Sequence, residues 1–109
     1  MDPEDQKLWV LARAVRARVR AEDGAALRDP DGRTYAGAGV SLPSLSLSAV
    51  GVCVAMALSS GSRGAEAVVV LADTPVSGAD LAVVREFAGP GVAVHRGSAD
   101  GRIEETLTT

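Results

Sequence analysis

The sequence contains few aromatic, cysteine and histidine residues. Its aromatic residues are Trp9, Tyr35 and Phe87, so a core has to be built from Ala, Val and Leu, with helices packed closely on a sheet. The single cysteine, Cys53, excludes an internal disulfide. Together with the single histidine, His95, it also excludes a zinc site made of several Cys and His ligands.

The sequence has neither an excess of positive charge nor the pattern expected of a secretory signal. The formal net charge of −3 argues against nucleic acid or an anionic membrane as a general partner. The N-terminal residues MDPEDQK are acidic and lack the apolar core of a secretory signal, so we expect a cytoplasmic protein. Residues 43–61 carry no charge, but their serines, proline and glycines make them a poor membrane span.

Residues 43–61 instead predict a buried helix. Between Leu45 and Leu58, apolar and small residues fall on every side of a helical wheel, so such a helix has no face suited to water. A chain of 109 residues is expected to form one domain, residues 1–109, whose sheet covers one face of this helix. A second copy of the chain is the natural cover for the other face, which predicts self-association.

The rest of the chain alternates helical and extended patterns. We expect three helices: a first helix capped by Asp2, the central helix, and a third helix capped by Ser77. The expected strands are a hairpin of residues 24–28 and 33–40, a buried strand at 67–72, and two further strands at 92–96 and 102–107. The alternating middle predicts parallel neighbours, and the hairpin adds an antiparallel pair. Gly37 and Gly39 indicate a bulge or a close backbone approach. The predicted fold class is α/β, with a mixed five-stranded sheet.

Several segments resemble the small homotetrameric cytidine deaminases. They are Gly24-Ala-Ala-Leu before Asp31-Gly-Arg33, Tyr35-Ala-Gly37, the apolar run 45–61 and Arg85-Glu-Phe87, and together they extend over about Leu11 to Leu107. They are similar to the hairpin, the first zinc-binding helix and the end of the second zinc-binding helix of that family. The resemblance implies a three-layer α-β-α fold with helices on both faces of the sheet, and a homo-oligomer, a tetramer ahead of a dimer.

The residues that carry the chemistry of that family are missing at the matching positions. Cytidine deaminases hold a zinc ion with three protein ligands to activate water, and they use a carboxylate to move protons. The alignment places Ser48 and Val50 at the first thiolate and the glutamate, and Ser77 and Asp80 at the other two thiolates. Serine is a poor zinc ligand and valine cannot move a proton. The resemblance therefore implies no metal, no cofactor and no deaminase activity.

Other family features are missing or have a structural interpretation. The family binds the nucleoside sugar through an Asn-x-Glu pair, where this chain has residues 39–43 with neither side chain. Cys53 lies three residues past the glutamate position and is interpreted as a small core residue. His95 ends an apolar strand and is interpreted as structural. The leading hypothesis is a catalytically inactive cytidine deaminase-like oligomer that binds or scaffolds.

Two alternatives stay open. In the first, the vestigial pocket binds a nucleoside, a nucleotide or an anion, through Ser48, Ser77 and Gly78 at the N-termini of two helices. In the second, three arginines on one face of the first helix bind a protein or RNA partner; these are Arg13, Arg16 and Arg20. The same arginines also suit the solvated C-terminal half of a helix.

Overall fold

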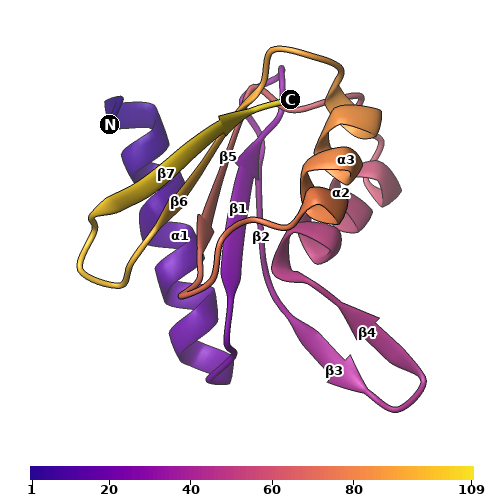
Figure 1. Ribbon diagram of the computed structural model, residues 1–109. Coiled ribbons are helices and arrows are strands. Elements are labelled where there is room, and N and C mark those ends of the chain that lie inside the picture. The colour runs from indigo at the N-terminus through magenta and orange to yellow at the C-terminus, as the bar shows by residue number, and fades with distance from the viewer.

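The computed structural model describes residues 1–109 and contains three helices and two sheets (Figure 1). The elements are α1 (Pro3–Val19), β1 (Gly24–Arg28), β2 (Thr34–Ala38), β3 (Val40–Leu42), β4 (Leu45–Leu47), α2 (Ala49–Ser59), β5 (Ala67–Leu71), α3 (Gly78–Ala88), β6 (Ala93–Gly97) and β7 (Ile103–Thr108). The main sheet has the order β2-β1-β5-β6-β7, in which β5 pairs parallel to β6 and antiparallel to β1. The predicted mixed five-stranded sheet is thus confirmed.

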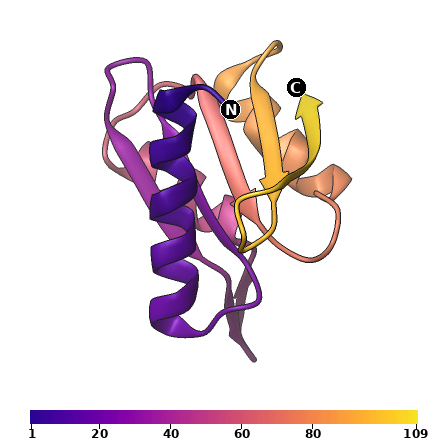
Figure 2. The same cartoon turned by 90° about the vertical axis from the view of Figure 1, so that its left-hand side faces the viewer.

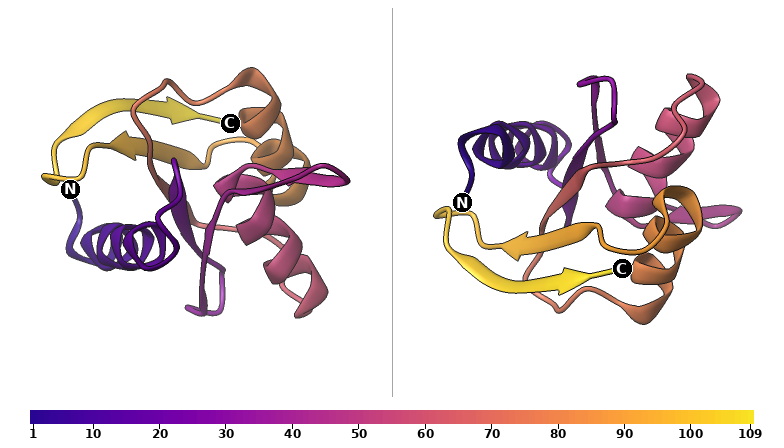
Figure 3. Two further views of the ribbon diagram at one scale, coloured as in Figure 1. Left: turned by 90° about the horizontal axis from the view of Figure 1, so that it is seen from below. Right: turned by 90° about the horizontal axis from the view of Figure 1, so that it is seen from above.

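Helices cover both faces of this sheet. α1 lies across one face (Figure 2), and α2 and α3 lie on the other (Figure 3). The central strand β5 is buried along its whole length, and its side chains alternate between two cores. Val68 and Val70 join the core under α2 and α3, whereas Val69 and Leu71 join the core under α1. The three layers follow from this alternation.

The strand neighbours differ in one respect from the expectation. β5 and β6 form the only parallel pair of the main sheet, because β1 lies between β2 and β5. The hairpin of β1 and β2 therefore enters the sheet with its first strand innermost. No helix of the protein combines the length and the apolar character needed to cross a membrane.

The central helix is shorter than predicted. Residues Leu45–Leu47 form β4, which pairs antiparallel with β3 in a separate hairpin that projects from the body of the molecule (Figure 1). The alternation of leucine and serine in this stretch has the period of a strand. α2 begins only after Ser48, whose side chain accepts a hydrogen bond from the backbone N–H of Gly51 at 3.0 Å.

One side of α2 is buried and the other is exposed. Cys53 and Val54 are buried in the core under α2 and α3, which agrees with the interpretation of Cys53 as a small core residue, while Met56 is exposed. The Cys53 thiol donates to the carbonyl oxygen of Ala25 at 3.2 Å, and burial raises its pKa to about 12. Gly37 allows close contact with this helix, because a β-carbon there would lie 2.5 Å from Cγ1 of Val52. The predicted close approach at this glycine is confirmed.

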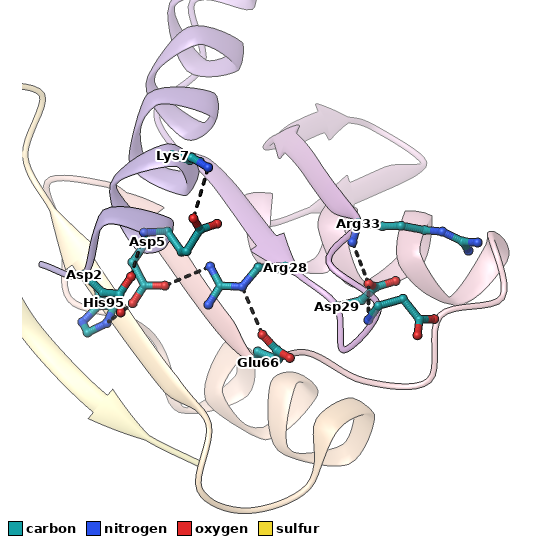
Figure 4. A network of polar contacts seen from close by, with 10 residues as sticks. Asp2, Asp5, Lys7, Arg28, Asp29, Arg33, Glu66 and His95 are labelled. Atoms are coloured by element: carbon teal, nitrogen blue, oxygen red, sulfur yellow. Dashed lines mark hydrogen bonds and ion pairs between the residues drawn. The ribbon is translucent and has the colours of Figure 1, made fainter.

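A network of ion pairs connects α1 to strands of the sheet that lie far from α1 in the sequence. The Asp5 carboxylate lies 3.1 Å from Nη1 of Arg28 and 3.5 Å from Nε2 of His95 (Figure 4). Arg28 also pairs with Glu66 at 3.1 Å, and Nδ1 of His95 lies 2.9 Å from the Thr106 hydroxyl. His95 thus joins α1, β6 and β7, which fits its structural interpretation.

Candidate functional site

The N-termini of α2 and α3 meet through a hydrogen bond between side chains. Ser48 precedes α2, and its hydroxyl donates to Oδ1 of Asp80, in the first turn of α3, at 2.7 Å. Ser77 precedes α3, and its hydroxyl accepts the backbone N–H of Asp80 at 3.0 Å. Three of the four positions singled out in the sequence therefore lie together, whereas the fourth, Val50, is buried in the core under α2 and α3.

A fourth side chain at this place was not found from the sequence. Asp23 lies between α1 and β1, and its Oδ2 accepts the backbone N–H of Ala49, the first residue of α2, at 2.9 Å. Gly39 leaves room for this carboxylate, since a β-carbon at Gly39 would overlap Oδ1 of Asp23. No local motif marks a capping residue so distant in sequence. The only indication in the sequence was that Asp23 directly precedes the strand that begins at Gly24.

A pocket of about 550 Å³ opens beside these helix starts, and we call it the helix-start pocket. Its polar lining consists mainly of Arg16, Glu22, Asp23, Asp73, Ser77 and Asp80. Four carboxylates face one guanidinium here, and that guanidinium lies 3.6 Å from Oδ2 of Asp73. The pocket therefore favours cations and hydrogen-bond donors over anions.

A second pocket of about 730 Å³ adjoins the first, because both are lined by Glu22 and Asp23. It also contains Ser48 and the segment 39–41. That segment starts the stretch which the resemblance matches to the sugar-binding residues of cytidine deaminases. Asp80 lines the first pocket and Ser48 lines the second, so their hydrogen bond links residues of the two pockets.

The loop leading into α3 is held firmly in place. Oε1 of Glu105, on β7, accepts the backbone N–H of Val76 at 2.8 Å and Nε of Arg96 at 3.0 Å. The pKa of Glu105 is lowered, first by the hydrogen bond from Val76 and then by Arg96. Arg96 also donates to the carbonyl oxygen of Ala72 at 3.2 Å. These contacts fix the start of α3 relative to the sheet.

The residues at the two helix starts do not fit a zinc ion. Ser48 and Ser77 supply neutral hydroxyls, and Asp80 is the only anionic group among the three aligned positions. The protein has no group of three His, Cys, Asp or Glu side chains placed to hold a metal ion. Val50 supplies neither a ligand nor a proton carrier.

Some of the backbone donors at the same helix starts are already used within the chain. The N–H groups of Ala49, Gly51 and Asp80 already donate to Asp23, Ser48 and Ser77, respectively. These are three of the orphan donors that a phosphate would use at a helix N-terminus. Gly78 is exposed, and a β-carbon there would meet nothing within 4 Å. An anion at this place would also face the carboxylates of the helix-start pocket.

The layers, the strand order and the paired helix starts define an α/β fold shared with the cytidine deaminases. The crystal structure of cytidine deaminase from Burkholderia pseudomallei superposes with a TM-score of 0.83 at 25% identity, covering 94% of this chain and 91% of that one. Cytidine deaminase from Mycobacterium leprae gives 0.75 at 22% identity over 98% and 94% of the chains. The enzyme from Mycobacterium tuberculosis gives 0.74 at 24% identity over 85% of each.

A model of the cytidine deaminase-like family matches residues 1–101. The chain therefore belongs to this family, as the resemblance of its short segments implied. No curated protein matches the sequence.

Proposed function

We propose that this protein is a catalytically inactive member of its family, which acts by binding as a cytoplasmic homo-oligomer of single-domain chains. The observation that supports this most directly is the hydrogen bond between Ser48 and Asp80. The alignment assigns both positions to zinc-binding thiolates, but neither residue has a thiol. Val50, at the position of the catalytic glutamate, is 1% exposed and packs in the core. The zinc ligands that activate water in the family and the carboxylate that transfers protons are both missing here.

Zinc binding and deamination test this proposal. We expect the purified wild-type protein, incubated with equimolar zinc and desalted, to retain no stoichiometric metal and to release no ammonia from cytidine. The variant Ser48→Cys/Ser77→Cys/Asp80→Cys is expected to retain about one zinc per chain, because three thiolates would then converge at the helix starts. Metal content is measured by mass spectrometry of the native protein.

A matched control has three cysteines at exposed positions that are dispersed over the chain, namely Ser44, Ser59 and Ala99. This variant is expected to retain no stoichiometric zinc. Stoichiometric zinc together with ammonia release in the wild type would refute the inactive assignment. A triple-cysteine variant no better than the control would instead refute the alignment of the three positions.

Self-association has support from apolar side chains that this chain leaves exposed. The hairpin of β3 and β4 exposes Leu42 at 60% and Leu45 at 48%, and these two residues are cross-strand partners. The adjacent helix α2 exposes Met56 and Leu58. Leucines paired on a projecting hairpin are typical of a surface that another chain covers. We propose a homotetramer ahead of a dimer.

The double variant Leu42→Asp/Leu45→Asp tests this surface. We expect the wild type to be oligomeric and the variant to be monomeric, since paired charges in an apolar interface cannot be desolvated. Light scattering coupled to size-exclusion chromatography measures the mass. The control Val10→Asp, at an exposed position on α1, is expected to leave the mass unchanged. A monomeric wild type, or a variant with wild-type mass, would contradict this interface.

A second candidate function is binding of a small molecule in the helix-start pocket. The pocket of about 550 Å³ is the observation that favours it. Its carboxylates suit the amino groups of a nucleobase better than a free anion. A rise in melting temperature with saturating cytidine tests this function, and no rise with any nucleoside would refute it.

A further inference from the structure

A groove lined by arginines runs beside the helix-start pocket. It has a volume of about 520 Å³, and its charged lining consists of Arg13, Arg16, Arg20 and Asp73. Arg13 and Arg16 lie three residues apart on one face of α1, and Arg20 follows the helix as its C-cap in the left-handed backbone conformation, so the expectation that all three share a helix face is corrected. The groove nevertheless brings the three side chains together. We call this the arginine groove. It carries more positive than negative charge, in contrast to the helix-start pocket.

Two of these guanidinium groups have no carboxylate partner. Arg16 lies 3.6 Å from Oδ2 of Asp73, and its Nε donates to the carbonyl oxygen of Ala21 at 3.4 Å. By contrast, Arg13 and Arg20 take part in no ion pair. Both side chains are exposed to solvent at the groove. They are therefore free to pair with an incoming anion.

Arg13 is also held in position. Its guanidinium carbon lies 5.3 Å from the centre of the Trp9 ring, and Nε1 of Trp9 donates to the carbonyl oxygen of Ser98 at 3.3 Å. The loop that contains Ser98 thus fixes the aromatic surface on which the cation rests. An arginine held in this way loses less side-chain entropy when it binds an anion than a free one.

The groove and the pockets are continuous with each other. Arg16 and Asp73 line both the arginine groove and the helix-start pocket. Arg20 and Ala21 line both the groove and the second pocket. A ligand can therefore extend from the carboxylates at the helix starts to the free guanidinium groups of Arg13, on α1, and Arg20, at its C-cap. Such a ligand needs hydrogen-bond donors at one end and a negative charge at the other.

We propose that the helix-start pocket and the arginine groove together bind a nucleoside monophosphate, an inference that rests on the second candidate function. The amino-bearing base lies against the carboxylates that include Asp23 and Asp80. The phosphate binds Arg13 and Arg20, because guanidinium groups form short, charge-assisted hydrogen bonds with phosphate oxygens. A single phosphate suits this place better than an RNA strand, since four carboxylates next to the groove would repel a longer phosphate backbone.

Calorimetric titrations of the 109-residue chain at low salt test the proposal, with cytidine and cytidine 5′-monophosphate as probes. We expect the monophosphate to bind at least about tenfold more tightly than cytidine, as two charge-assisted contacts would provide. The variant Arg13→Gln/Arg20→Gln is expected to lower the affinity for the monophosphate to that for cytidine, while cytidine binding stays unchanged. The control Arg18→Gln/Arg63→Gln removes two exposed arginines outside the groove and should change neither affinity.

Other outcomes separate this inference from the function on which it rests. If cytidine and its monophosphate bound equally, before and after the Arg13 and Arg20 substitutions, the nucleotide assignment would fail and ligand binding in the pocket would stand. Equal binding of inorganic phosphate and the monophosphate, abolished by the substitutions and accompanied by no binding of cytidine, would overturn both, because the base would contribute nothing. Binding of single-stranded RNA with no binding of the monophosphate would overturn the proposal in favour of an RNA partner.

Discussion

Replacement of Gly24 by alanine is expected to lower the free energy of unfolding by about 3 kcal/mol. Gly24 starts β1 at the place where α1 crosses it. A β-carbon at this position would overlap the carbonyl oxygen of Ala12 and would lie 2.7 Å from Cβ and 3.3 Å from the backbone N of Arg16. These atoms belong to the helix backbone or lie directly on it, so no change of rotamer can relieve the overlap. α1 would have to move away from the sheet.

Chemical denaturation followed by circular dichroism measures this effect. Gly78 provides the control, because a β-carbon there would meet nothing within 4 Å and the position begins α3. We expect Gly78→Ala to change the unfolding free energy by less than about 0.5 kcal/mol. If Gly24→Ala were as stable as this control, α1 could not lie as close to β1 as described. The expected loss for Gly24→Ala is a large part of the free energy of unfolding of a typical domain, which is roughly 5–15 kcal/mol.

The elements that were predicted from the sequence carry their signals locally. Five consecutive apolar residues at Ala67–Leu71 indicate a strand covered on both faces. Asp2 and Ser77 are capping residues that accept backbone hydrogen bonds at the predicted helix starts. Such features depend on a few neighbouring residues. They were therefore available without knowledge of the tertiary structure.

The features that were missed depend on competition or on distant contacts. The apolar content of residues 45–47 suggested a helix. In the structure these residues form a strand, as their alternation of leucine and serine favours, and the helix begins only after the capping residue Ser48. The capping of α2 by Asp23 requires two segments that meet only in the folded chain. Likewise, the alignment placed Ser48 and Asp80 at the site, but their hydrogen bond depends on how α2 and α3 lie on the sheet.

Replacement of Asp29 by alanine is expected to lower the melting temperature at pH 7 by more than about 10 °C. Asp29 is fully buried at the turn between β1 and β2. Its carboxylate accepts the Ser62 hydroxyl at 2.5 Å and the backbone N–H groups of Arg33 at 2.9 Å and Asp31 at 3.0 Å. Ser62 also lies 3.1 Å from the Tyr35 hydroxyl. Alanine would leave these donors without an acceptor, in a place with little access to water.

The same carboxylate makes part of the stability depend on pH. The pKa of Asp29 is lowered, first by the hydrogen bond from Ser62 and then by the N–H groups of Arg33 and Asp31, while burial acts in the opposite direction. A carboxyl whose pKa is lower in the folded state stabilises the protein above its unfolded pKa of about 3.9. That contribution disappears as the pH falls through the folded value.

Melting temperatures between pH 7 and pH 3 therefore separate Asp29 from the other acidic residues. We expect Asp29→Asn to melt well below the wild type at pH 7, and the difference to shrink steadily as the pH falls below about 4. The exposed neighbour Asp31, substituted by asparagine, is the control and should follow the wild type throughout. A difference between wild type and Asp29→Asn that stayed constant over this range would show that the charge of Asp29 does not stabilise the fold. The hydrogen bonds from Ser62 and the turn would then act equally well on a neutral side chain.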